Sequence, residues 1–156
     1  MKTCFYAGSF DPFTNGHLHV VKEASKLFDK VYVGIGVNPG KSRHYKQEDM
    51  KEIIMECLKD ENIFNVEIIV YSGLTIDCAT SVGATYFVRG IRNGMDYEYE
   101  ENLAAINEEL AGINTIYIRA GEYGIISSSF VRELLKYNKS VEKYVPTRIA
   151  KYLEGK

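Results

Sequence analysis

The chain lacks a charge excess of either sign. Its 156 residues include 19 lysines and arginines and 21 aspartates and glutamates, which gives a formal net charge of −2. Proteins that coat nucleic acids or bind membrane surfaces usually carry a strong basic excess. The charge balance, together with the absence of an aromatic–basic recognition motif, argues against a nucleic-acid partner and against a membrane partner.

Cysteine is also scarce, and long apolar runs are missing. Cys4, Cys57 and Cys78 lie far apart, without a CxxC pair or a Cys/His spacing typical of zinc. We expect buried, reduced thiols and no metal site built by the protein. No stretch approaches the roughly 20 apolar residues of a membrane span, and the apolar run at residues 1–7 is too short for a signal peptide. These absences predict a cytoplasmic protein.

What the sequence does contain is an alternation of apolar, often β-branched runs with helical patterns. The expected strands cover residues 3–7, 31–37, 66–70, 85–88 and 115–118, and the expected helices cover 15–28, 47–58, 75–82, 96–110, 129–136 and 146–153. The alternation predicts an α/β fold with a doubly wound, five-stranded parallel sheet. The length, the apolar content of 46% and the absence of repeats or a linker predict a single domain over residues 1–156.

Ligands of such sheets bind beyond the carboxyl ends of the strands. The loop that leaves the first strand reads Gly-Ser-Phe-Asp-Pro-Phe-Thr-Asn-Gly-His over residues 8–17. Thr14 can cap the following helix, and His17 falls in the first helical turn, so we expect its imidazole to point toward the strand ends. Helix N-termini attract anions, and the place therefore suits a phosphate. A purely structural histidine beside a capping threonine is the alternative interpretation.

Other polar residues follow the later strands. Three consecutive serines, residues 127–129, open a predicted helix where one would suffice as a cap, so their hydroxyl and N–H groups can line a polyphosphate. Lys41 follows the second strand, and Arg89 and Arg92 follow the fourth. Surface charge is the alternative for each of these basic residues. Arg89 comes directly off a buried strand, where an unpaired charge is costly, and an anionic ligand is the partner that we expect for it.

Together these motifs resemble the bacterial phosphopantetheine adenylyltransferases, a family within the cytidylyltransferase-like nucleotidyltransferase superfamily. The resemblance covers nearly the whole chain. It rests on Tyr6–Pro12, Thr14–His17, Lys41, Val88–Arg92, Asp96–Glu100 and Ile126–Ser129. The two segments between residues 88 and 100 distinguish this family from nicotinate-mononucleotide adenylyltransferases and glycerol-phosphate cytidylyltransferases, which share the first motif. An alternative of another class is a catalytically silent nucleotide-binding module, against which the retention of His17, Lys41 and the serines argues.

The resemblance implies a Rossmann-like nucleotidyltransferase fold and the transfer of the adenylyl group of ATP to 4′-phosphopantetheine in coenzyme A biosynthesis. It implies Mg²⁺ as the cofactor, bound with ATP, and a homohexamer. The implied catalytic residues are His17 and Lys41. Those implied to bind ATP are Ser9, Phe10, His17, Gly90, Ile91, Arg92, Glu100, Tyr123, Gly124, Ile125, Ile126, Ser127, Ser128 and Ser129. Those implied to bind phosphopantetheine are Ser9, Lys41, Leu74, Thr75 and Arg89.

Three places depart from patterns common in that family. Ser9 stands where some members have threonine, and Tyr123 stands where some have tryptophan. The stretch Ser42–Tyr45 lacks a proline that is common there, so the resemblance predicts neither the conformation of this loop nor the role of His44.

Overall fold

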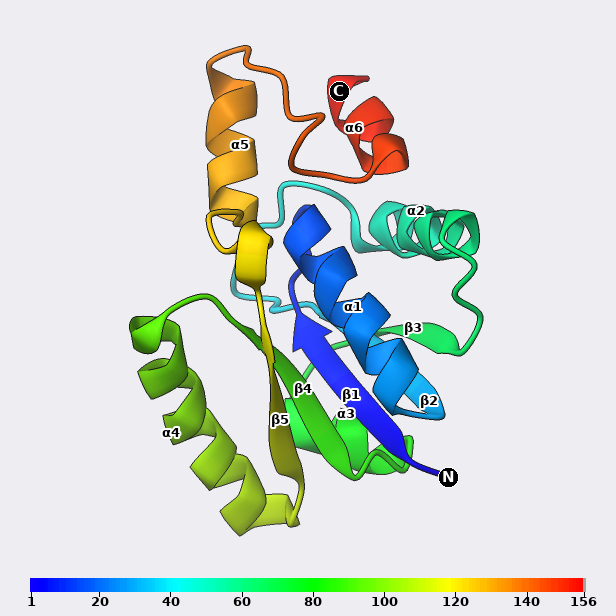
Figure 1. Ribbon diagram of the computed structural model, residues 1–156, viewed down its shortest axis with the longest axis vertical. Coiled ribbons are helices and arrows are strands. Elements are labelled where there is room, and N and C mark those ends of the chain that lie inside the picture. Colours follow the sequence, from blue (N-terminus) through cyan, green and yellow to red (C-terminus); the bar gives the residue numbers. More distant parts are fainter. Residues whose placement is uncertain (156) are drawn as a thin grey trace.

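Five parallel strands form one sheet at the centre of the molecule. In the computed structural model, which describes residues 1–155, the strands lie in the order β3-β2-β1-β4-β5 (Figure 1). They are β1 (Thr3–Gly8), β2 (Lys30–Gly36), β3 (Val66–Tyr71), β4 (Tyr86–Ile91) and β5 (Asn114–Arg119). The helices are α1 (Asn15–Leu27), α2 (Gln47–Asp60), α3 (Thr75–Ser81), α4 (Gly94–Ala111), α5 (Ser128–Lys136) and α6 (Thr147–Glu154), with a short 3₁₀ helix, η1 (Gly121–Tyr123). The predicted doubly wound fold is confirmed.

The two faces of the sheet are covered by different helices. Along β1, Cys4 and Tyr6 join an apolar cluster that includes residues of α1, α2, α5 and α6. Phe5, which points to the other face because side chains alternate along a strand, packs in a second cluster with Ala79 of α3 and with Ile113. Figure 1 shows α1 lying across one face and α3 behind the sheet. Helices on both faces leave the carboxyl ends of the strands as the open edge.

The direction of winding reverses between β1 and β4. The chain proceeds outward from β1 through β2 to β3, then crosses back to β4 beside β1 and continues to β5. The loops that leave β1 and β4 therefore diverge, and a crevice forms between neighbouring strand ends. In doubly wound sheets this reversal point is the usual ligand site.

Strand β4 extends further than the sequence pattern predicts. Residues Arg89, Gly90 and Ile91 pair in the parallel ladder with residues 117–119 of β5, so they lie in the strand and do not follow it. The sequence pattern does not indicate a strand at Arg89 and Gly90, because neither arginine nor glycine is typical of a buried strand. The glycine has a packing reason: a Cβ at Gly90 would lie 3.0 Å from Cγ2 of Val20, so α1 approaches the strand closely here.

Smaller differences concern helix ends and cysteines. Pro146 is the N-cap of α6 rather than part of its first turn. Of the three free cysteines, Cys4 and Cys57 are buried as expected, whereas Cys78 on α3 is only half-buried because this short helix lies near the surface. Among the described residues, no helix combines the length and apolar character that crossing a membrane requires.

Candidate active site

Two neighbouring cavities open at the carboxyl ends of the strands. The first, of about 320 Å³, lies toward α1 and α5, and we call it the α1–α5 cavity. The second, of about 540 Å³, lies toward the ends of β2 and β3, and we call it the β2–β3 cavity. Ala7, Gly8, Ser9 and Arg89 line both, so these residues form a shared wall. Both volumes lie within the usual range of small-molecule sites, and the arrangement can hold two ligands side by side.

Two helix N-termini line the α1–α5 cavity. Thr14 caps α1, with its side chain accepting a hydrogen bond from the backbone N–H of His17. Ser127 caps α5, with its Oγ accepting from the N–H of Phe130 at 3.0 Å. Gly16 and His17 of α1 and Ser128 of α5 also line the cavity. Because the first N–H groups of a helix and its dipole favour negative charge, the cavity suits a polyphosphate.

His17 takes part in the cap of its own helix. The N–H of Thr14 donates to Nδ1 of His17 at 2.9 Å, which completes a reciprocal capping box. Nδ1 is therefore an acceptor, and a neutral imidazole must carry its proton on Nε2. The structural and functional interpretations of His17 are thus compatible: one ring nitrogen fixes the helix start, and the other can donate to a ligand in the α1–α5 cavity.

The surroundings of His17 keep its ring neutral. The rings of Tyr6, Phe10 and Phe13 lie around it, with centroids 6.5, 4.9 and 5.6 Å from that of the imidazole. Removal from water lowers the pKa of His17 from 6.5 to about 3, and the positive charges of Arg89 and Arg92 act in the same direction. His17 can therefore donate a hydrogen bond from Nε2 while its ring stays uncharged at neutral pH.

Arg89 already has a partner of its own. Its Nε and one terminal nitrogen donate to the two carboxylate oxygens of Glu100 at 2.7 and 3.0 Å, and its other terminal nitrogen donates to the carbonyl of Ala7. The partner of this half-buried charge within the protein is therefore the buried carboxylate of Glu100 from α4, which the sequence pattern did not indicate, and contact between Arg89 and an anionic ligand stays a prediction. Arg89 still lines both cavities and can present its guanidinium to a ligand there.

The side-chain charges around the α1–α5 cavity balance one another. Arg92 pairs with Asp96, with Nε–Oδ2 at 2.8 Å, and this pairing lowers the pKa of Asp96. With the Arg89–Glu100 pair included, two arginines and two carboxylates line the cavity. The features of the cavity that suit an anion are therefore mainly the two helix N-termini.

The three serines have different environments. Ser127 is the cap described above, and Ser128 donates its hydroxyl hydrogen to the carbonyl of Pro12 at 2.7 Å. Ser129 accepts from a terminal nitrogen of Arg132 at 3.3 Å and does not line the cavity. Two serine hydroxyls thus hold local structure, and the backbone N–H groups at the start of α5 are the groups left to donate to an anion.

Most of the residues that the resemblance singles out lie together. The α1–α5 cavity is lined by Ser9, Phe10, His17, Arg89, Gly90, Arg92, Glu100, Tyr123, Ile126, Ser127 and Ser128, and the β2–β3 cavity by Ser9, Thr75 and Arg89. The structure does not bring Lys41, Leu74, Ile91, Gly124, Ile125 or Ser129 to either wall. Lys41 lies on an exposed turn whose Asn38 and Pro39 line the β2–β3 cavity.

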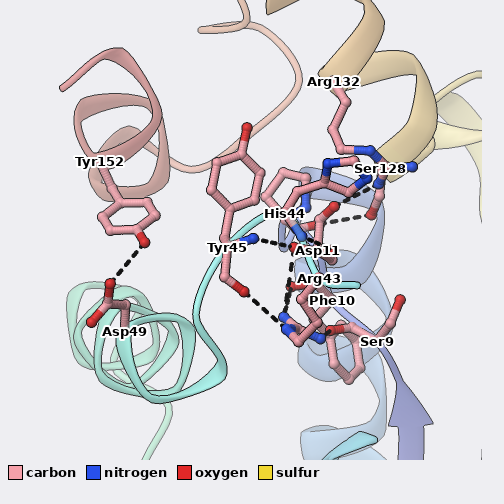
Figure 2. Close-up of polar contacts among 11 residues, drawn as sticks. Ser9, Phe10, Asp11, Arg43, His44, Tyr45, Asp49, Ser128, Arg132 and Tyr152 are labelled. Carbon is pink, nitrogen blue, oxygen red and sulfur yellow. Dashed lines mark hydrogen bonds and ion pairs between the residues drawn. The ribbon is translucent and has the colours of Figure 1, made fainter. Parts of the chain in front are cut away.

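A polar network around the turn after β1 was not apparent from the sequence (Figure 2). The carboxylate of Asp11 accepts the backbone N–H groups of His44 and Tyr45, each at 2.9 Å. Arg43 donates to the carbonyl of Ser9 at 2.6 Å, and Arg132 of α5 donates to the carbonyl of Asp11 at 2.6 Å. The backbone of His44, whose role was not predicted, thus helps to join the loop after β2 to the turn after β1. The Asp-Pro pair was the only signal, and it did not reveal these long-range partners.

Within residues 1–155, no group of three or more His, Cys, Asp or Glu side chains is placed to hold a metal ion. The two carboxylates of the α1–α5 cavity, Asp96 and Glu100, are each engaged by an arginine.

Comparison with known proteins shows the family of the chain. The model of the family described as "Cytidylyltransferase-like" matches residues 5–134. Phosphopantetheine adenylyltransferase of Bacteroides thetaiotaomicron is 42% identical over 94% of this chain and 96% of its own length. The proteins of the same name from Bacteroides fragilis and Streptococcus pyogenes serotype M2 are each 44% identical, over 94% and 98% of this chain and 97% and 94% of their own lengths. The chain belongs to the cytidylyltransferase-like family, in its phosphopantetheine adenylyltransferase branch.

Solved structures of proteins with lower sequence identity share the fold. A putative nicotinate-nucleotide adenylyltransferase from Vibrio parahaemolyticus has a TM-score of 0.73 at 20% identity and covers 98% of this chain and 99% of its own. A bifunctional NMN adenylyltransferase/ADP ribose pyrophosphatase from Francisella tularensis has a TM-score of 0.78 at 17% identity, covering 99% of this chain and 49% of its own. These likenesses support the Rossmann-like nucleotidyltransferase fold.

Proposed function

We propose that this adenylyltransferase transfers the adenylyl group of ATP to 4′-phosphopantetheine, forming dephospho-coenzyme A and releasing pyrophosphate. The observation that carries the proposal is the pair of cavities with a shared wall at Ser9 and Arg89. ATP would occupy the α1–α5 cavity, where two helix N-termini meet its phosphates. The phosphopantetheine phosphate would reach the same wall from the β2–β3 cavity, so that the reacting groups meet at Ser9.

The chemistry requires little acid–base assistance. The attacking group is an oxygen of the 4′-phosphate, which is already an anion, so no general base has to remove a proton. It forms a bond to the α-phosphorus of ATP while the bond to the bridging oxygen breaks, and pyrophosphate leaves with that electron pair. Catalysis then consists of alignment and charge stabilisation. Holding the two reactants in line can contribute roughly 7–11 kcal/mol in the favourable limit.

His17 is proposed to donate its Nε2–H to the α-phosphate as negative charge shifts in the pentacoordinate state. A neutral donor with a low pKa is suited to this role because it stays neutral over the working pH range and keeps its single proton on Nε2. The N–H groups at the start of α5 would receive the pyrophosphate. Lys41, two residues after Pro39 of the β2–β3 cavity, would offset the charge of the acceptor phosphate.

Mg²⁺ is proposed to enter with ATP as part of the substrate. Magnesium commonly binds substrate phosphates and water with few protein ligands. Asp96 and Glu100 are each paired with an arginine. This pairing favours Mg²⁺ bound mainly by the phosphates of ATP over Mg²⁺ bound by these two carboxylates.

A cytoplasmic homohexamer that acts in coenzyme A synthesis is also part of the proposal. Helix α4 supports an assembly, because Met95, Tyr99, Ile106 and Leu110 along it are exposed, and contiguous exposed apolar surface often marks a protein interface. Size-exclusion chromatography with light scattering tests the assembly: we expect six times the chain mass of 17.7 kDa, and a monomer would refute it.

A turnover assay tests the reaction. Three separate reactions are run with the protein and Mg²⁺. The first contains ATP and 4′-phosphopantetheine, the second ATP and nicotinate mononucleotide, and the third CTP and glycerol phosphate. We expect dephospho-coenzyme A and an equal amount of pyrophosphate from the first reaction alone. Turnover with another acceptor would assign the activity of a different nucleotidyltransferase of the superfamily. The absence of pyrophosphate in every mixture would favour a catalytically silent nucleotide-binding module.

A further inference from the structure

The turn that carries Ser9 has an unusual backbone. Phe10 adopts a positive φ of 47°, a region that residues with a side chain seldom occupy. Such a conformation persists only where its surroundings hold it in place. The turn lies between β1 and the buried Pro12, and its first residue belongs to the wall shared by the two cavities. Whatever holds this turn therefore also sets the position of the wall.

Side chains from distant segments hold four consecutive carbonyls of this turn. Arg43 donates to the carbonyls of Ser9 and Phe10, at 2.6 and 3.5 Å. Arg132 donates to that of Asp11, and Ser128 to that of Pro12, as described above. Arg132 and Ser128 both come from α5, whereas Arg43 comes from the loop after β2. Arg43 thus links the first half of the turn to the loop after β2 (Figure 2).

The guanidinium of Arg43 joins the turn to its own loop. Its Nε donates to the carbonyl of Tyr45 at 2.9 Å, while its terminal nitrogens reach the turn, and one of them lies 3.7 Å from Oδ1 of Asp11. The side chain is only 12% exposed. The planar fork of arginine allows one side chain to donate in several fixed directions at once, which lysine does not match. Arg43 lines neither cavity, so it acts through the residues it holds.

We propose that Arg43 is a positioning residue that couples the two half-sites. By fixing Ser9 and the 38–45 loop to each other, it holds the wall against which both phosphates align. This inference rests on the proposed adenylyl transfer. Because the ATP-side elements α1 and α5 do not contact Arg43 through any of these bonds, its loss should disturb the alignment of the reactants more than the binding of ATP.

The test compares Arg43→Met, which keeps the length of the side chain without its donors, with Arg43→Lys and with the control Arg148→Met. Arg148 also makes two short hydrogen bonds, to Asp60 at 2.6 and 3.0 Å, but it joins α6 to α2 and lines neither cavity. For each variant the melting temperature, the Kd for ATP, and kcat and KM for 4′-phosphopantetheine are measured.

For Arg43→Met we expect kcat to fall by about 10- to 100-fold, because misplacement of about 1 Å can cost that much. The Kd for ATP should stay within about threefold, which separates a loss of alignment from a loss of ground-state binding. Arg43→Lys should recover part of the loss, and Arg148→Met should keep kcat within about twofold. A kcat for Arg43→Met close to that of the wild type, or a fall matched by an equal loss of ATP affinity, would overturn the inference.

Three further outcomes separate the positioning role from the proposed function. If Arg43→Met does not fold, Arg43→Lys carries the test, and full wild-type kcat in the lysine variant overturns the inference. If the wild type makes no dephospho-coenzyme A, the proposed function fails and this inference fails with it. If the wild type makes dephospho-coenzyme A and Arg43→Met is equally active, the positioning role is overturned and the proposed function stands.

Discussion

His17 caps a helix with one ring nitrogen and, in the proposed mechanism, donates to a ligand with the other. Nδ1 accepts the Thr14 N–H and completes the cap of α1, and this bond places the remaining proton on Nε2. A more flexible donor would have to be ordered each time that a ligand binds. The cap removes that cost because it holds the ring in one orientation and one tautomer.

Replacing His17 should therefore reduce the rate more than the binding of ATP. We expect His17→Ala to lower kcat by about 10²- to 10³-fold, the usual effect of removing one transition-state donor, while ATP still binds. Steady-state kinetics and calorimetric titration with ATP measure the two quantities. The control is His44→Ala, since the exposed His44 lines neither cavity and its backbone N–H is retained. A large loss of ATP affinity with unchanged kcat in His17→Ala would contradict the role.

The low pKa of His17 also predicts how stability depends on pH. The unfolded chain binds a proton at His17 below its ordinary pKa of 6.5, whereas the folded protein does so only near 3. The contribution of the neutral ring is therefore complete above pH 6.5 and is lost as the pH falls from 6.5 toward 3. Between pH 7.5 and 5.0, urea unfolding should show that the wild type loses up to about 2 kcal/mol more than His17→Gln. Equal losses in the two proteins would show that this pKa is not lowered by folding.

At the scale of elements, α4 is held to the sheet through a charge. Glu100 is the only described residue of this helix that is buried, and its carboxylate receives two hydrogen bonds from Arg89 of β4. An 18-residue helix attached in this way differs from α1, which buries several apolar side chains. The ion pair thus connects α4 to the strand that forms part of both cavities.

Breaking that pair should destabilise the fold. Glu100→Gln leaves the half-buried Arg89 guanidinium without its countercharge, and we expect a loss of about 1–3 kcal/mol in the free energy of unfolding. The more exposed pair of Lys22 and Glu61, with Nζ–Oε2 at 3.0 Å, offers a control, and Glu61→Gln should cost less than about 1 kcal/mol. Urea titrations of both variants measure the difference. Similar small losses would mean that the buried pair does not hold α4.

The elements were predictable to the extent that their signal is local. Alternating apolar periods predict the strands and helices within a few residues, and the serine and threonine caps mark the starts of α1 and α5. The end of β4 was not predictable, because arginine and glycine are uncommon in strands. Arg89 is accommodated by its ion pair with Glu100 of α4, and Gly90 by the close approach of Val20 of α1. Partners distant in sequence cannot be read from a local pattern.

The same limit applies to the polar network around the turn after β1. Asp11 meets the N–H groups of His44 and Tyr45 across 33 and 34 residues, and Arg132 reaches the Asp11 carbonyl across 121. The motif residues around Ser9 and His17 could be identified from sequence and resemblance. The residues that hold them in position became visible only once the fold had brought these segments together.

At the scale of the whole molecule, the reversal of winding between β1 and β4 explains why the site lies where it does. Loops that diverge at this point open two cavities, and the carboxyl end of β1 with its turn remains between them as a common wall. Two anionic substrates can then approach one point from different sides, each with its own contacts. The fold therefore supplies the alignment, and few side chains are needed for the chemistry.

A crystal structure of the protein with 4′-phosphopantetheine and an ATP analogue that cannot transfer its adenylyl group tests this account most directly. We expect the analogue in the α1–α5 cavity, its α-phosphate about 3 Å from Nε2 of His17, and the acceptor phosphate in the β2–β3 cavity against Ser9, on the opposite side of the α-phosphorus. Both ligands in one cavity, or an α-phosphate out of reach of His17, would contradict the claim that the shared wall is where the two substrates react.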